Sequence, residues 1–147
     1  MAANTTPIFT NVPDHSNNAG TGFYSGTSIG TAAANDYTGI DTDYQLVFTA
    51  DATDGSYVER IRFVSRGTNI ATVARIFLNN GSAVGTATNN QMYGQQSLPA
   101  TTAIDTAATV EIDYPMRIAL AAGERIYVGC ATAVAAGWSV VVVGGRY

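Results

Sequence analysis

The side chains that most often perform catalysis or bind metals are scarce in this chain, which has one histidine, His15, and one cysteine, Cys130. His15 lies in a stretch of turn-forming residues that cannot hold it rigidly, so no Ser-His-Asp set or Cys-His pair is expected. Cys130 lies in an apolar strand pattern, which is typical of a small buried thiol. We therefore expect no enzymatic activity, no metal site and no cofactor.

Four acidic residues surround the first predicted strand and are the remaining candidates for a metal site: Asp41, Asp43, Asp51 and Asp54. Their carboxylates could supply oxygen ligands to Ca²⁺. They lack the regular spacing of a dedicated calcium loop, and aspartates in turns commonly bond to nearby backbone N–H groups. We favour the turn interpretation over the calcium site.

Asparagine pairs mark two turns, at Asn79-Asn80-Gly81 and at Asn89-Asn90. Lectin-type sandwiches bind sugar hydroxyls with such side chains beside an aromatic ring, here Tyr93 or Trp138. Asparagine is also favoured in turns for its conformation alone, so the turn interpretation stands beside the glycan interpretation.

Arginine supplies all seven basic residues, and four of them lie close together: Arg60, Arg62, Arg66 and Arg75. The flanking sequence alternates with period two, which predicts two strands paired as a hairpin over residues 57–79. We expect this hairpin to present the four arginines on one face, together with Val64 and Phe77. A mixture of arginine and apolar groups is typical of a protein interface, although arginine stems also lie along ordinary sheet surfaces.

Composition narrows the classes of partner. Charged residues make up only 12% of the chain, which favours a surface that rests against other proteins. The net charge of −4 disfavours direct nucleic-acid binding, which needs a basic face. No run approaches the roughly 20 apolar residues that span a bilayer, and the first residues lack the pattern of a signal peptide. We expect synthesis in a cytoplasm and no membrane partner.

Residues 1–40 differ from the rest of the chain, because small polar residues and glycines dominate without a sustained period. Isolated apolar residues recur there like anchors on an extended segment: Ile8, Phe9, Phe23, Tyr24 and Tyr37. This pattern predicts an arm that becomes ordered against a neighbouring subunit or a host surface, and a free disordered tail is the alternative.

Residues 41–147 predict one β-rich domain. About eight short strands follow one another at regular spacing, without alternating helices. Residues 115–128 alternate on both sides of Ala121-Ala122-Gly123, which predicts a second hairpin. The run from Trp138 to Val143 predicts a central strand covered on both faces. The expected fold is therefore all-β: an antiparallel, jelly-roll-like sandwich with an extended N-terminal arm.

The run from Tyr57 to Gly81, YVERIRFVSRGTNIATVARIFLNNG, resembles a motif of small virion proteins from tailed bacteriophages. Those proteins carry the run R-I-x-(F/A)-x-x-x-G-T-N-x-A-T-x-x-R-x-F-x-N-N-G, followed by L-P-A-G-x-x-(I/V) and A-x-A-A-G-W-x-V. The later segments correspond here to Leu120–Ile126, with Ala122 in the Pro-Ala position, and to Ala133–Val140. The resemblance covers roughly residues 44–147 and omits the arm.

This resemblance implies a phage structural protein: a capsid cement or decoration subunit that binds and stabilises the assembled shell. Such subunits typically sit as trimers over capsid symmetry axes. The expected partners are thus the major capsid protein and further copies of the chain, on the capsid surface of a virion assembled in the host cytoplasm. A tail- or fibre-associated sandwich that binds receptors or glycans is the alternative.

The resemblance provides no catalytic residues. The candidate partner-binding residues come from the arm and the arginine-bearing strands: Ile8, Phe9, Phe23, Tyr24, Tyr37, Arg60, Arg62, Arg66, Arg75 and Phe77.

Overall fold

The computed structural model describes residues 12–15 and 27–147, and nearly all regular structure in this part of the chain is β-strand. The single helical element there is one 3₁₀ turn, η1. The elements are β1 (Val12–His15), β2 (Ser28–Ile29), β3 (Gln45–Thr49), β4 (Ser56–Ser65), β5 (Thr72–Asn79), η1 (Ala87–Asn89), β6 (Asn90–Leu98), β7 (Glu111–Leu120), β8 (Arg125–Cys130) and β9 (Trp138–Arg146).

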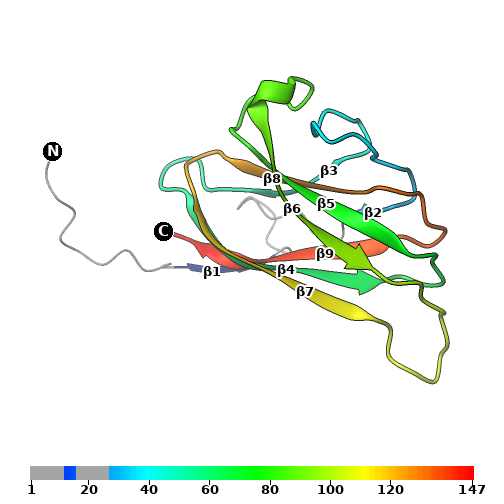
Figure 1. Cartoon of the computed structure of the whole chain (residues 1–147). Helices are drawn as coiled ribbons and strands as arrows, with labels where there is room; N and C mark the ends of the chain where they lie inside the picture. The colour runs from blue at the N-terminus through cyan, green and yellow to red at the C-terminus, as the bar shows by residue number, and fades with distance from the viewer. Residues whose placement is uncertain (1–11, 16–26) are drawn as a thin grey trace, which may run out of the picture.

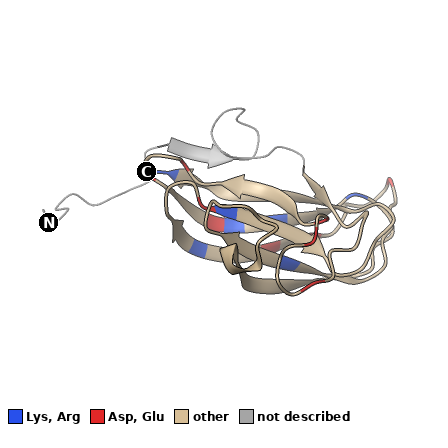
Figure 2. Ribbon diagram, turned by 90° about the horizontal axis from the view of Figure 1, so that it is seen from above, with Lys and Arg blue, Asp and Glu red and all other residues tan. Residues whose placement is uncertain are grey.

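The strands form two antiparallel sheets packed face to face, which confirms the predicted β-sandwich (Figure 1). Sheet A has the order β1-β9-β4-β7, and the short β2 also pairs with β9. Sheet B has the order β3-β8-β5-β6. Strands of both sheets run along the long dimension of the molecule (Figures 1 and 2).

The strand pairs are nested along the chain, and this nesting defines the topology. The innermost pair is β5 with β6, followed outward by β4 with β7, β3 with β8, and β1 with β9. A long hairpin whose two arms roll up together produces this order, and such rolling yields two four-stranded layers. The fold is therefore a jelly-roll-like sandwich, as the sequence predicts.

Both predicted hairpins are wrong, because each joins strands of opposite sheets. The segment 66–71 carries the chain from β4 in sheet A to β5 in sheet B, and residues 121–124 carry it from β7 to β8. Among the described strands, β5 and β6 are the pair that is consecutive in sequence and hydrogen-bonded. Period-two alternation identifies the residues that face inward but not the neighbouring strand, since strands of either sheet show the same pattern.

The main core lies between the two sheets. It includes the inward residues Ile61 and Phe63 of β4 and Val140 and Val142 of β9, all essentially inaccessible to solvent. Trp138, the only tryptophan, is buried at the start of β9. The central position predicted for this strand is confirmed, since β9 lies between β1 and β4. The predicted cover on both faces is wrong, because the outward residues Val141 and Val143 are only half-buried.

A register shift in β3 alters which residues of that strand reach the core. Pairing with β8 shifts between Leu46 and Phe48, so both Val47 and Phe48 are buried in the main core. Tyr44 and Leu46 instead join a second apolar cluster on the outer side of sheet B. The sequence prediction placed Tyr44, Leu46 and Phe48 on one face, and this bulge makes it wrong.

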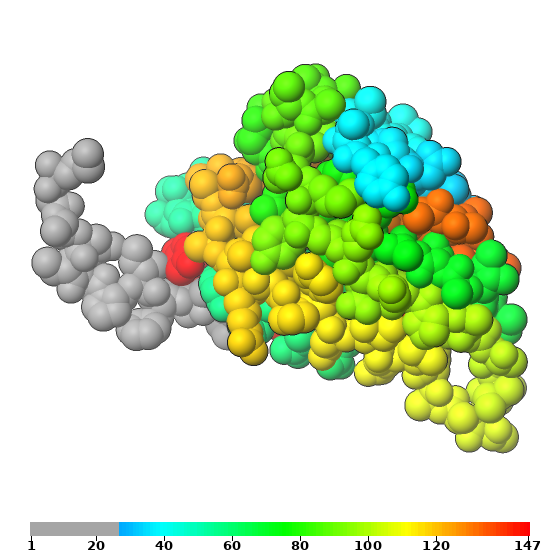
Figure 3. All heavy atoms as spheres, in the orientation of Figure 1, coloured from blue at the N-terminus to red at the C-terminus, as the bar shows by residue number. Residues whose placement is uncertain are grey.

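Residues 30–44, a segment named here the strap, cover the outer face of sheet B over β5 and β8. Ala34 and Tyr44 of the strap pack with Phe77 of β5 and Tyr127 of β8 in the second cluster. The backbone N–H of Ala34 donates to the Cys130 carbonyl, which fixes the start of the strap to β8. In Figure 3 the strap is the cyan surface at the upper right, next to the green β5–β6 region.

Described parts of the predicted arm belong to the sandwich. β1 and β2 both pair with β9, and Ile29 is buried in the main core. Of the predicted arm anchors, Tyr37 is in the strap, whereas Ile8, Phe9, Phe23 and Tyr24 lie outside the described residues.

Candidate interaction surface

The structure separates the five residues predicted to form one arginine-rich face. Arg60 and Arg62 lie on β4 of sheet A, Arg75 and Phe77 lie on β5 of sheet B, and Arg66 lies in the loop between them. The prediction of a single face formed by these residues, with Val64 and Phe77 on the same side, is therefore wrong. Arg75 and Phe77 point away from the core of the sandwich on sheet B, and Arg60 and Arg62 point away from it on sheet A.

Arg75 fastens the strap to sheet B. It is only 7% exposed, and its Nη1 donates to the backbone carbonyls of Ala34 and Asp36, both at 3.3 Å. Its guanidinium carbon lies 4.0 Å from the centroid of the Tyr37 ring, a cation–π distance. The Arg75 guanidinium is therefore buried in contacts with its own chain and is not free to bind a partner in this structure.

Phe77 is closed off by the same segment. It is 1% exposed, its ring meets Tyr44 edge-on at 4.9 Å, and Gly39 passes directly over it. A Cβ on Gly39 would lie 2.7 Å from the Phe77 ring, and the φ of +76° at Gly39 favours glycine as well. Phe77 is a core residue of the strap cluster and is not available to a partner in this structure.

Asp36 shapes the turn of the strap above Arg75. One carboxylate oxygen accepts hydrogen bonds from the N–H groups of Thr38 and Gly39, each at 2.6 Å, and the other accepts from the N–H of Asp41 at 2.7 Å. Partial burial alone would raise the pKa of Asp36, but the hydrogen bonds from Thr38, Asp41 and Gly39 outweigh it and lower that pKa.

The outer face of sheet A brings Arg60 and Arg62 together with carboxylates from β7. Arg62 holds Asp113 with two hydrogen bonds, Nε to Oδ1 at 2.7 Å and Nη2 to Oδ2 at 2.9 Å. This fork lowers the pKa of Asp113 and raises the pKa of Arg62. Arg60 reaches the same carboxylate only at 3.6 Å.

A bulge next to Arg60 adds a second charged pair to this face. Pairing between β4 and β7 shifts so that Glu59 faces two residues of β7, Met116 and Arg117. Arg117 has a φ of +52°, an uncommon conformation for a residue with a side chain. Its side chain is 73% exposed, and its Nε lies 3.6 Å from Glu59 Oε1.

Valines complete the face. Val141 of β9 is aligned with Arg62, and Val143 is aligned with Arg60. Val64 and these two valines are half-buried. The surface named here the β4 face therefore consists of Glu59, Arg60, Arg62, Val64, Glu111, Asp113, Arg117, Val141 and Val143.

The acidic and asparagine candidates form turns. Asp41 accepts the N–H of Asp43, and Asp51 accepts the N–H groups of Thr53 and Asp54, as the turn interpretation predicts. The carboxylates of Asp41 and Asp51 therefore stabilise turns by accepting hydrogen bonds from nearby backbone N–H groups. Among the described residues, no group of three or more His, Cys, Asp and Glu side chains lies close enough together to hold a metal ion.

The asparagines bond mainly to each other and to nearby carbonyls. Asn79 Nδ2 donates to Asn90 Oδ1 at 2.8 Å, and Asn80 Nδ2 donates to Asn89 Oδ1 at 3.2 Å, which ties the β5–β6 turn together. Trp138 is fully buried and cannot stack on a sugar in this structure. The predicted partnership of Trp138 with a glycan is wrong.

Cys130 is buried, as its strand pattern predicts. Desolvation raises the pKa of its thiol to about 12, so the thiolate is suppressed at neutral pH. Within residues 12–15 and 27–147, the structure contains no helix long and apolar enough to cross a membrane.

Comparisons with protein-family models, curated proteins and solved structures returned no significant match to this chain.

Two structural features were not foreseen from the sequence. The strap was expected to contact a neighbour, although Asn35-Asp36-Tyr37-Thr38-Gly39 carries the residue types of a tight turn. Asn69 is a buried hydrogen-bonding residue that joins three loops, whereas its sequence context suggested only a break between strands.

Proposed function

We propose that this chain is a virion structural protein, a decoration subunit that binds the assembled capsid shell of a tailed bacteriophage through its β4 face. Its partners are the major capsid protein and further copies of itself. Two lines support the proposal: the resemblance of residues 44–147 to small phage virion proteins, and the jelly-roll-like sandwich that carries those segments.

The composition of the β4 face is the observation that carries the proposal. It presents half-buried valines beside arginines and carboxylates, the mixture that suits a protein partner better than water alone. Arg62 makes the short hydrogen bonds to Asp113. Arg60 and Arg117 approach their carboxylates only to 3.6 Å, so their guanidinium N–H groups can still donate to acidic or carbonyl groups of a partner.

Such a subunit stabilises the shell by linkage. It binds the assembled shell more tightly than free capsid subunits, so occupancy shifts the equilibrium toward the assembled state. Shells without the subunit are then expected to lose resistance to heat or to low salt.

Cosedimentation with purified shells that lack this chain tests the proposal. The wild-type chain is expected to sediment with the shells. The double variant Arg60→Glu with Arg117→Glu is expected to bind at least about tenfold more weakly, because the reversed charges repel the acidic groups that the arginines would meet.

The matched control is Arg125→Glu, which reverses one charge on β8 of the other sheet and should leave shell binding unchanged. Unchanged Trp138 fluorescence would establish that each variant is folded. Wild-type protein that fails to bind shells, or a double variant that binds as well as the wild type, would contradict the proposal.

A further inference from the structure

One end of the sandwich carries a nearly uncharged, apolar surface, named here the tip. It is formed by the β4–β5 loop (66–71), the β6–β7 loop (99–110) and the β8–β9 loop (131–137). Ile70 and Ile104 are 60% and 57% exposed there, an unusual cost for large apolar side chains in water. The β6–β7 loop projects at the lower right of Figure 3. The exposed alanines of the tip are Ala71, Ala100, Ala103, Ala107, Ala108, Ala133 and Ala135.

Hydrogen bonds centred on Asn69 join the three loops of the tip. The buried side chain of Asn69 accepts the N–H groups of Ala136 and Gly137 at 2.9 and 3.0 Å, and its Nδ2 donates to the Gly137 carbonyl at 3.1 Å. The backbones of Asn69 and Thr101 exchange two hydrogen bonds, which joins the third loop. Ile70 directly follows Asn69, so it is displayed beside this hydrogen-bonded junction of the three loops.

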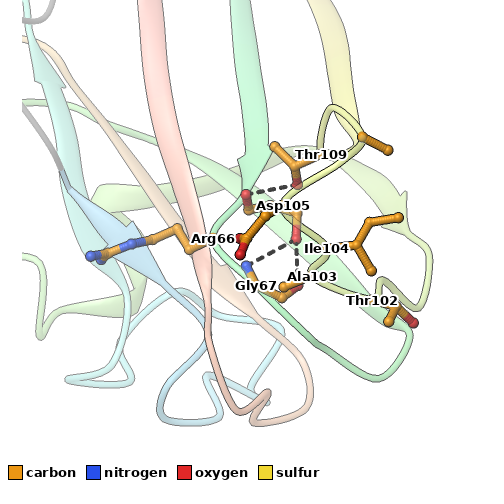
Figure 4. Close-up of a pocket in the computed structure, with 9 residues that line it drawn as sticks. Arg66, Gly67, Thr102, Ala103, Ile104, Asp105 and Thr109 are labelled. Atoms are coloured by element: carbon orange, nitrogen blue, oxygen red, sulfur yellow. Dashed lines mark hydrogen bonds between the residues drawn. The ribbon is translucent and has the colours of Figure 1, made fainter.

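Two hollows accompany the protruding side chains. One of about 190 Å³ lies beside Ile104, between the β6–β7 loop and the end of β4 (Figure 4). A wider one of about 600 Å³ lies at the ends of β5, β6 and β8. Val73, Leu98 and Pro99 line it, as does Ala71, the residue that follows Ile70. The smaller hollow has a mixed lining that includes Arg66, Thr102 and Asp105, and the wider one is mainly apolar. Protruding apolar side chains and hollows thus occur on one surface, which could fit the same surface of another copy.

The charges of the tip are self-complementary. Arg66 and Asp105 are the charged residues of these three loops, one of each sign, and neither makes an ion pair among the described residues. Arg66 is exposed, and Figure 4 shows its side chain extending away from the other labelled residues. Between two copies related by rotation, Arg66 of one can meet Asp105 of the other.

We propose that copies of this chain associate through their tips, with the isoleucines packed together and Arg66 of each copy paired with Asp105 of a neighbour. The proposed function includes self-association, and this proposal rests on it in that respect by naming the tip as the surface involved. It is independent of shell binding, which we assign to the β4 face.

Sedimentation velocity of the full chain over a range of concentrations tests the proposal. The wild type is expected to form an oligomer. Arg66→Asp and Asp105→Arg are each expected to raise the dissociation constant about tenfold or more, since each places like charges together across the interface. The double variant Arg66→Asp with Asp105→Arg restores opposite charges and is expected to return to within about threefold of the wild type.

The matched control is Asp54→Arg, an exposed reversal in the β3–β4 loop outside the tip, which should leave association unchanged. A wild-type chain that stays monomeric at every soluble concentration would overturn the proposal. The proposal would also be overturned if neither single variant weakened the oligomer. The same holds if the double variant failed to restore the dissociation constant that a single variant had raised. Cosedimentation of the same variants with shells tests the proposed function separately, because shell binding is assigned to the β4 face and not to the tip.

Discussion

Arg62 and Arg75 stand on strands that follow one another in sequence, yet their surroundings are opposite. Arg75 lies on the outer face of sheet B, beneath the strap, and donates to strap carbonyls. Arg62 lies on the outer face of sheet A, where its side chain stays more than one-third exposed and braces Asp113. The outer face of sheet B is covered by its own chain over β5 and β8, and no described segment lies across the outer face of sheet A in the same way.

This comparison shows how residue type alone can mislead. Arginine beside apolar residues is typical of a partner surface, but on sheet B these residues contact the strap of the same molecule. The same mixture on sheet A has no described intramolecular cover. If this contrast is correct, substitutions on sheet B should affect stability, whereas substitutions on the β4 face should affect binding.

Phe77→Ala should have the largest effect. It removes a fully buried ring under the strap and leaves a cavity, so we expect a loss of about 3–4 kcal/mol in the free energy of unfolding. Denaturant unfolding followed by Trp138 fluorescence measures it. The matched change on the β4 face, Val64→Ala, should cost less than about 1 kcal/mol. Equal losses at the two positions would remove the contrast between the faces.

Gly39→Ala should come next, measured against Gly123→Ala. Both glycines have φ near +77°, so both variants incur about 1 kcal/mol from the left-handed conformation. An added Cβ at Gly123 meets nothing within 4 Å, whereas at Gly39 it meets the Phe77 ring. We expect Gly39→Ala to cost about 2–3 kcal/mol by denaturant unfolding. Similar costs for the two variants would show that the strap does not press on Phe77.

Arg75→Ala should destabilise the protein by about 2 kcal/mol, because it removes charged hydrogen bonds to two carbonyls and the contact with Tyr37. Arg75→Lys should recover only part of this loss, since lysine lacks the planar fork. Arg60→Ala is the control and should change stability by less than about 1 kcal/mol. A neutral Arg75→Ala variant would mean that other contacts hold the strap.

The smallest effect should be an acid sensitivity of the strap. The folded-state pKa of Asp36 is lowered, so its contribution is present above the unfolded pKa of about 4 and is lost as pH falls through the folded pKa. Hydrogen exchange at Thr38 and Gly39 should accelerate in that window. Asp36→Asn should remove most of this dependence, and a variant with the wild-type pH profile would assign the effect to another group.

The inward pattern of the sandwich was predictable from the sequence because it is local. The buried Ile61 and Phe63 alternate with half-buried residues as the period requires, and Cys130 is buried as expected. The strand partners were not predictable, since β4 and β5 show the same alternation although they belong to different sheets. The burial of Phe77 depends on contacts with Gly39 and Tyr44, which lie more than thirty residues earlier in the chain. A local sequence pattern cannot predict such contacts.

The sequence predicts part of the candidate surface, again because only local patterns can be interpreted from it. Arg60 and Arg62 were identified by type and spacing, and both lie on the β4 face. Their partners Asp113 and Glu111 come from β7, about fifty residues later, and the bulge that brings Arg117 to Glu59 depends on the pairing register. Register is a property of the assembled sheet, so the sequence pattern alone could not specify it.

A reconstruction of the intact particle that locates this chain tests the central claim most directly. Our account predicts that the β4 face, with Arg60 and Arg117, lies against the capsid shell, while the strap over sheet B faces away from it. A particle in which the strap side contacts the shell, or in which the chain occupies the tail and is absent from the capsid, would contradict the account.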